Sequence, residues 1–353
     1  MKTRISTIVF ALGFVFLLAG INRAEAKVSL DKVLADKTFE VDKDAQLLID
    51  HEFGNVNIQN WDENNISIKV TAHIESNNEG QAQKILDRVH LSISGDKNKV
   101  SSVCSLSNSS NGKTNFSIDV EVFMPKSASL QLKHKFGAAY IETVEGTAKI
   151  KSEYGSVQAV SLLNNDTRVD VSFGSADIGK MANGNLNINY SSLDLDDASQ
   201  LTIDSKYSDV SVKAIESGNI SVEGGSAEIG SVAALILDSK FSSVEVGNIS
   251  TSLQAHTEYG SLEVKFVKAQ FSTVDVENKF GGVELGIDKS ATYGVDVQTS
   301  FGDFDYPESL AKFSNKYTSS TGSSYSGKIG DANGSTSKLI ARTSYGNIEV
   351  SAK

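Results

Sequence analysis

Residues 186–195 read Leu-Asn-Ile-Asn-Tyr-Ser-Ser-Leu-Asp-Leu, and variants of this stretch recur every 17 to 21 residues. The constant element is an aromatic residue followed by a small one. A near-fixed period of this size is typical of a repeat architecture, in which each unit packs on its neighbours along the chain. The pairs are Phe136-Gly137, Tyr154-Gly155, Phe173-Gly174, Tyr190-Ser191, Tyr207-Ser208, Gly224-Gly225 (where the aromatic residue is lost), Phe241-Ser242, Tyr259-Gly260, Phe280-Gly281 and Phe301-Gly302, with outlying copies at Phe53-Gly54 and Tyr345-Gly346.

The apolar residues around each pair change parity, which predicts a bend. We call the aromatic position k. Around Tyr207, Ile203 lies at k−4, whereas Val210 and Val212 lie at k+3 and k+5. Because side chains alternate between the two faces of a strand, these two groups would point in opposite directions if the strand ran straight. We therefore expect a corner at k+1 and k+2, where Gly and Ser predominate and Gly tolerates a positive φ.

The repeat thus predicts an all-β fold, a right-handed parallel β-helix or solenoid over residues 126–307 with coils of 17–21 residues. A coil of 17 residues has a contour of roughly 56 Å at ~3.3 Å per residue, which suits a small two- or three-sided coil. Successive coils should stack ~4.8 Å apart. We expect the aromatic residues to form a stacked column inside the corner.

The spacing differs on both sides of the repeat, and these segments should cap the solenoid, since open strand edges invite aggregation. We expect residues 27–125 to form a strand-rich unit with one helix at about 78–90. The helix is indicated by Ile85, Leu86 and Val89, which would share one face. Residues 308–353 predict a second cap, with polar loops and closing strands at 338–343 and 347–351.

The N-terminus has the features of a signal peptide. Lys2 and Arg4 precede an apolar run, and Ala24-Glu25-Ala26 fits a small-x-small cleavage site, so residues 1–26 should be removed. Cleavage would take away three basic residues and one acidic residue and change the formal net charge from −11 to −13. We expect an exported protein, in the periplasm or at the cell surface, with no membrane span after cleavage. Its acidity makes nucleic acid an unsuitable partner.

The position k+4 is acidic in seven of nine coils. Stacked coils would place like charges about 5 Å apart, so something must offset their repulsion. Position k−1 alternates in sign from Lys206 to Lys279 and offers a partial answer. The column is either a solvated outer face or a weak stripe for divalent cations or cationic ligands, although Ca²⁺ needs about six to eight converging oxygens. The k+4 residues are Gln158, Asp177, Asp194, Ser211, Glu228, Glu245, Glu263, Glu284 and Asp305.

No catalytic constellation is recognisable. Cys104 is the only cysteine, and a buried small side chain or an incidental surface thiol explains it better than a nucleophile. None of the five histidines has metal-ligand spacing, and no Ser-hydrolase elbow or phosphate-binding glycine motif is present. Only Arg168 and Arg342 follow Arg88, which argues against a pectinase-like lyase. We assign no catalytic, cofactor-binding or metal-ligating residue and expect no cofactor.

Three features together resemble a known family. The apolar step ending at Pro125 precedes repeated aromatic-Gly-x-apolar-x-apolar coils, and the chain closes with Thr343-Ser344-Tyr345-Gly346-Asn347-Ile348. Over most of residues 40–353 this pattern resembles the bacterial putative-adhesin family of exported β-helix proteins labelled DUF4097, which is common in Bacteroidetes. The resemblance implies an adhesive or cell-envelope role, and it brings no catalytic residues.

The sequence therefore favours a non-enzymatic, exported, adhesin-like interaction protein. Its solenoid surface would bind an envelope or extracellular protein or glycan whose identity the sequence does not give. Two alternatives stay open: an envelope-stress or signalling accessory scaffold, and a polysaccharide-active β-helix enzyme.

Overall fold

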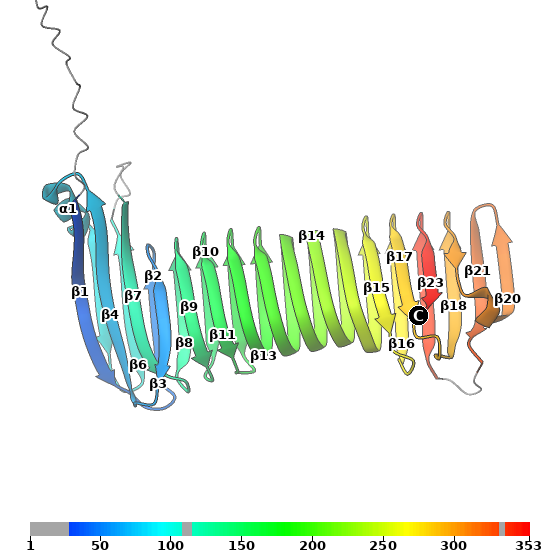
Figure 1. Ribbon diagram of the computed structural model, residues 1–353, viewed down its shortest axis with the longest axis horizontal. Helices are drawn as coiled ribbons and strands as arrows, with labels where there is room; N and C mark the ends of the chain where they lie inside the picture. Colours follow the sequence, from blue (N-terminus) through cyan, green and yellow to red (C-terminus); the bar gives the residue numbers. More distant parts are fainter. Residues whose placement is uncertain (1–27, 108–114, 332–335) are drawn as a thin grey trace, which may run out of the picture.

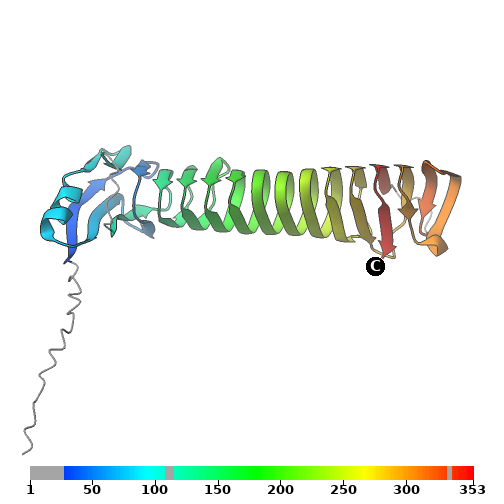
Figure 2. The ribbon, with the colours of Figure 1, turned by 90° about the horizontal axis from the view of Figure 1, so that it is seen from above.

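The computed structural model describes residues 28–107, 115–331 and 336–353. The predicted signal peptide at 1–26 lies outside the described residues. The described chain forms one elongated β-solenoid, with a strand-rich unit at one end and a hairpin at the other (Figures 1 and 2). No helix in this part of the chain has the length and apolar character needed to cross a membrane.

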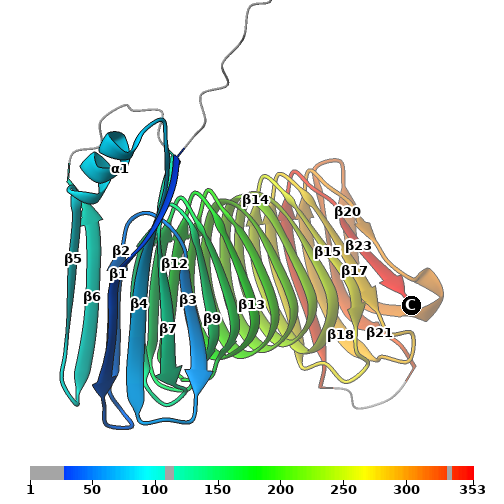
Figure 3. The same cartoon turned by 60° about the vertical axis from the view of Figure 1, so that its left-hand side comes forward.

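Each coil contributes two strands, which form two parallel ladders on opposite sides of a flattened coil (Figure 3). In the first ladder Ile150 pairs with Leu132 and with Val169, so equivalent positions of successive coils lie in register. The predicted all-β parallel solenoid is therefore confirmed. The coil strands are β2 (Gln46–His51), β3 (Val56–Trp61), β8 (Ser129–Lys135), β9 (Ala138–Val144), β10 (Ala148–Glu153), β11 (Ser156–Leu162), β12 (Thr167–Ser172), β13 (Ser175–Asn189), β14 (Ser192–Glu258, which winds through several coils), β15 (Ser261–Val267), β16 (Thr273–Lys279), β17 (Gly282–Ile287), β18 (Tyr293–Ser300), β19 (Phe304–Asp305), β22 (Lys338–Ser344) and β23 (Ile348–Ala352).

The core lies between the two ladders and is filled from the predicted positions. In the coil of Tyr154, Ile150 at k−4 and Val157 and Ala159 at k+3 and k+5 are buried. Leu162 at k+8 is buried as well, and the pairing of β11 with β13 skips one residue before it. This skipped residue restores the inward direction of the side chain and marks a second corner of the coil.

The first corner is built differently from the prediction. The positive φ belongs to the aromatic residue itself in ten corners, for example 57° at Tyr154, whereas at k+1 only Gly54, Gly137 and Gly225 have one. Position k+1 must be small for another reason. A Cβ on Gly155 would lie 2.3 Å from the carbonyl oxygen of Gly137, and one on Gly174 would lie 1.8 Å from that of Gly155. The backbones of successive coils touch at these two glycines, so a Cβ on either one would force the coils apart.

The N-terminal end encloses the first coil. β6 and β7 run parallel to β2 and β3 on their outer side, while β8 and β9 pair on their inner side. Phe53-Gly54 is therefore a corner of the stack and not an outlying copy. The remaining elements of this end are β1 (Val28–Glu40) and β4 (Asn65–Ser76), which pair antiparallel, the helix α1 (Glu79–Leu86), and β5 (Val89–Gly95), β6 (Lys99–Leu106) and β7 (Asn115–Pro125).

The single predicted α-helix is present but short. Asn78 caps it, accepting a hydrogen bond from the backbone N–H of Gln81 at 2.9 Å. Ile85 and Leu86 are buried as predicted. The helix ends at Leu86 instead of His90, because Val89 already belongs to β5, which pairs antiparallel with β6.

At the C-terminal end the chain doubles back into the stack. After β18 and β19 comes a short 3₁₀ turn (Glu308–Leu310) and the antiparallel hairpin of β20 (Ala311–Ser319) and β21 (Gly322–Ile329). β22 then pairs with both β16 and β18, and β23 with both β17 and β19. The last coil of the chain thus lies inside the solenoid, between two earlier coils (Figure 1).

Candidate interaction surface

The corner residues form a column of stacked aromatic rings. Neighbouring rings have centroids 4.7 to 5.3 Å apart and planes within 15° of parallel. These separations are typical of offset stacking, worth about 0.5–1.5 kcal/mol per pair. The predicted stacking is confirmed. In spatial order the aromatic column consists of Phe53, Phe136, Tyr154, Phe173, Tyr190, Tyr207, then a gap at Gly224, and Phe241, Tyr259, Phe280, Tyr345 and Phe301.

The aromatic column lies outside the corner, so its predicted interior position is wrong. The ten rings with positive φ are between 45% and 64% exposed, from Phe280 to Phe241. A residue in the left-handed region leaves the alternation of the strand, which turns its side chain away from the core. Large aromatic residues gathered in one long exposed row are uncommon on a protein surface, and such apolar patches mark interaction sites.

The predicted acidic column at k+4 lies on the flat face of the second ladder. Asp177 pairs in register with Asp194, and Glu263 pairs with both Glu245 and Glu284. All nine predicted side chains are at least partly exposed. The sequence reasoning missed one member, Glu349, which pairs with Glu284 and Asp305. Glu349 lies four residues after Tyr345, which is the k+4 spacing of the column. The sequence pattern nevertheless assigns this segment to a terminal cap, so Glu349 is not counted as a member.

Lysines at k+6 offset the charges of the acidic column. Lys265 pairs with Glu245 of the column in the preceding coil. Lys213 pairs with Asp196, which itself lies at k+6, and its charge also acts on Asp177 and Asp194 of the column. Hydrogen bonds to these carboxylates raise the pKa of both lysines. The alternating charges at k−1 also pair, as between Lys206 and Glu223 at 3.7 Å, but they lie on the other side of the aromatic column. Within the described residues no group of three or more His, Cys, Asp or Glu side chains is arranged to hold a metal ion.

The interior of the first corners holds two buried histidines and a buried thiol whose pKa values are shifted. His51 and His134, both at k−2, are buried and stack with centroids 6.1 Å apart. Burial, and then the neighbouring His134, lowers the pKa of His51 to about 4. Cys104 is buried next to His51 in the ladder, and burial together with Glu52 raises its pKa to about 11. Such a thiol is a weak nucleophile.

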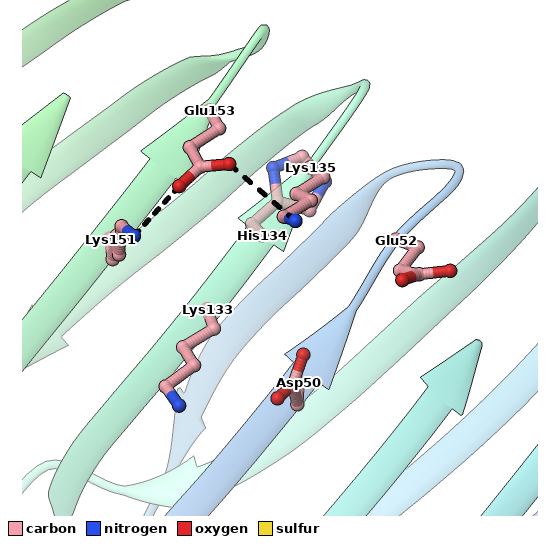
Figure 4. A pocket seen from close by; sticks show the side chains of 7 residues that line it. All are labelled: Asp50, Glu52, Lys133, His134, Lys135, Lys151 and Glu153. Atoms are coloured by element: carbon pink, nitrogen blue, oxygen red, sulfur yellow. Dashed lines mark ion pairs between the residues drawn. The ribbon is translucent and has the colours of Figure 1, made fainter. Parts of the chain in front are cut away.

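A groove of about 360 Å³ borders one member of this pair, His134, and is otherwise lined by Asp50, Glu52, Lys133, Lys135, Lys151 and Glu153 (Figure 4). Its lining is mixed in charge, and Glu153 lies between two lysines, 2.7 Å from Lys151 and 3.5 Å from Lys135. Hydrogen bonding to Lys151 is the main cause that lowers the pKa of Glu153. Glu153 and the two lysines therefore satisfy one another's charge.

The two parallel ladders and the exposed columns define the protein as a parallel β-solenoid. The chain belongs to the Toastrack DUF4097 family, whose profile matches residues 45–351.

Solved structures similar to this chain include two from Parabacteroides. A putative adhesin from Parabacteroides distasonis is 14% identical, with 72% of this chain and 94% of that chain covered and a TM-score of 0.36. A putative adhesin from Parabacteroides merdae is 13% identical, with coverages of 70% and 94% and a TM-score of 0.33. A putative cell adhesion protein from Clostridium sporogenes is 11% identical, with coverages of 93% and 100% and a TM-score of 0.18. No curated protein matches the chain.

Proposed function

We propose that this protein is an exported, non-enzymatic, adhesin-like interaction protein of the cell envelope. It binds an envelope or extracellular partner along one strip of its surface, formed by the aromatic column and the acidic column. The single observation that supports this function is that both columns are exposed and run along the solenoid axis through successive coils, with one gap in the aromatic column at Gly224. Exposed aromatic rings supply apolar contact area, and a row of carboxylates attracts cationic groups.

The scaffold holds the exposed side chains rigidly, which suits recognition of a partner with matching spacing. Each coil is hydrogen-bonded to the coils on both sides, as Ile150 is to Leu132 and Val169, so the exposed side chains have fixed spacing. A partner that matches this spacing binds without ordering the surface first, which lowers the entropic cost of association. The predicted signal peptide supports export to the compartment in which such a partner is met.

Binding can be tested by charge reversal on the two flat faces. The double variant Glu228→Lys/Glu263→Lys reverses two charges of the acidic column, and Asp204→Lys/Asp238→Lys reverses two exposed charges of the first ladder. The secreted form of the chain, immobilised, is incubated with envelope extract of the native bacterium. We expect a saturable partner that the first variant loses and the second retains. Wild-type protein that captures nothing from envelope extracts or intact cells would contradict the proposal.

Export is tested separately. Cell fractionation combined with protease digestion of intact cells should place the mature chain in the periplasm or at the surface. Recovery of the full-length chain in the cytoplasm alone would exclude an envelope role.

A further inference from the structure

The aromatic column has one vacancy, at Gly224. The backbone of this coil keeps the shape of most others, because Gly224 has a φ of 69° and the column's aromatic residues other than Phe53 have values of 50° to 59°. Only the ring is missing. Tyr207 and Phe241 therefore flank a position in the column that no ring of its own occupies, although the Tyr207 ring leans toward it.

The two rings that face the vacancy show the effect of the missing neighbour. Phe241 is 64% exposed and Tyr207 is 58% exposed, the two highest values among the column's rings. They are two coils apart, about 10 Å at the usual strand spacing, so each presents a ring face and not only an edge. Tyr207 is tilted by 15° from Tyr190, the largest deviation in the column, and its Cδ1 would lie 2.9 Å from a Cβ on Gly224.

A shallow groove of about 570 Å³ leads to the vacancy along the corner. Tyr190 and Tyr207 form its apolar part, and Ser191, Ser208 and Asp209 form its polar part. Asp209 accepts a hydrogen bond from Ser226 at 2.6 Å. The Ser191 and Ser208 hydroxyls already bond within the corner. The Asp209 carboxylate is therefore the acceptor that a peptide segment lying in this groove would find for a backbone N–H, next to an opening between two rings.

The charges near the vacancy balance each other. Lys206 pairs with Glu223 on one flank at 3.7 Å, and Lys240 follows in the next coil, while Asp209 lies on the other flank. Two positive and two negative side chains give no preference for a charged occupant. The two ring faces favour a flat apolar one, and the column itself fills every equivalent position with a phenyl or phenol ring.

We propose that the vacancy at Gly224 is a docking site for an aromatic side chain of a protein partner. The ring enters between Tyr207 and Phe241 and completes the column, stacking offset on both faces, while the flanking peptide lies in the groove beside Asp209. The proposal rests on the proposed function and names the chemistry by which the strip recognises its partner.

The test uses two small fluorinated probes and ¹⁹F NMR, because the protein contains no fluorine. The probes are acetyl-Gly-(5-fluoro-Trp)-Gly-amide and, as the aliphatic control, acetyl-Gly-(trifluoro-Leu)-Gly-amide. Gly224→Phe places a phenyl ring of the protein itself in the vacancy, so that a probe is excluded. Tyr207→Leu/Phe241→Leu removes both ring faces, and Tyr154→Leu/Phe280→Leu removes two rings far from the vacancy as a matched control.

We expect saturable broadening of the tryptophan probe with the wild-type protein and with the matched control. Binding should weaken at least about fivefold in the other two variants, the size of loss expected when ring stacking of this kind is removed. Equal binding by Gly224→Phe and wild type, or equal binding of both probes, would overturn the proposal. Absence of saturable tryptophan-probe binding by the wild-type protein would overturn it too.

Capture from envelope extract separates this inference from the proposed function. If wild-type protein captures a partner and Gly224→Phe captures it equally well, the docking site is wrong and the proposed function stands. If wild-type protein captures nothing while the tryptophan probe still binds at the vacancy, the site stands and the proposed function fails.

Discussion

The rings of Phe280 and Tyr345 stack with centroids 5.0 Å apart and planes 3° from parallel, although 65 residues separate them in the chain. Tyr345 stacks equally on Phe301, at 4.9 Å. The C-terminal coil is thus held on both sides, and it joins the body of the solenoid to the coil of β18 and β19. β22 and β23 therefore connect the coil of β16 and β17 to the coil of β18 and β19.

Removing this coil should detach the end of the solenoid. A chain truncated after residue 337 lacks β22 and β23, so β16 and β18 both lose a parallel partner. We expect hydrogen-exchange protection to be lost over β18–β21 and kept over β8–β11, since coils depend on their neighbours. Unchanged protection of β18–β21 in the truncated chain would contradict the intercalated position of the last coil.

The tight backbone contact at k+1 predicts that a Cβ there destabilises the fold, and the neighbouring residue at k+2 provides a control. A Cβ on Gly281 would lie 1.7 Å from the carbonyl oxygen of Gly260, whereas a Cβ on Gly282 would have no atom within 4 Å. Gly281→Ala should lower the free energy of unfolding by at least about 1–3 kcal/mol, the usual range for overpacking. Gly282→Ala should change it by less than about 0.5 kcal/mol. Urea denaturation measures both, and equal effects would refute the packing argument.

Several parts of this structure could be predicted from the sequence. The parity change around each aromatic residue located the corner, and the positions k−4, k+3 and k+5 gave the core, because both follow from the alternation of side chains in strands. The acidic column followed from the same argument. Residues such as Glu228 and Glu263 are exposed where the pattern places them.

Other parts could not be predicted, for physical reasons. Aromatic residues rarely adopt positive φ, so the pattern assigned the bend to the neighbouring glycine, and the column of Tyr154 and its equivalents was placed inside. The corner at Tyr345-Gly346 was recognisable, but chain order does not reveal that its coil lies between two earlier ones. The lysines that offset the acidic column, Lys213 and Lys265, occupy k+6, a position with no consistent residue type.

The buried histidine pair predicts a pH dependence of stability. The pKa of His51 is about 4 in the folded protein, and that of His134 is also lowered by burial. Unfolded histidine has a pKa of about 6.5, so below this pH the unfolded chain binds more protons and stability falls, with the loss complete near pH 4 for His51. Burial disfavours the protonated, positively charged form of His51 in this core.

The variant His51→Val/His134→Val isolates this effect, because Val171 and Val222 occupy the same k−2 position in other coils. Between pH 7 and pH 4.5 the wild-type protein should lose about 1–3 kcal/mol more of its free energy of unfolding than the variant does. Urea denaturation at the two values measures the difference. Carboxylates titrate in both proteins alike, so parallel pH profiles would show that the histidines do not contribute.

Filling the vacancy should also reveal what the column does for stability. Gly224→Phe adds two stacked pairs, worth about 0.5–1.5 kcal/mol each, and places a non-glycine residue at positive φ, which costs about 1–2 kcal/mol. Because these contributions nearly cancel, we expect the midpoint of thermal unfolding to stay within a few degrees of the wild-type value, as a change of about 1 kcal/mol in a large domain allows.

The adjacent residue provides the contrast for this variant. A Cβ on Gly225 would lie 2.1 Å from the carbonyl oxygen of Ser208, so Gly225→Ala must separate two coils, whereas the obstacle at Gly224 is only the tilted ring of Tyr207. Gly225→Ala should therefore unfold at a clearly lower temperature than Gly224→Phe, although it adds a much smaller side chain. If the phenylalanine variant is the less stable of the two, the position at Gly224 does not accommodate a ring, and an incoming aromatic side chain would not fit there either.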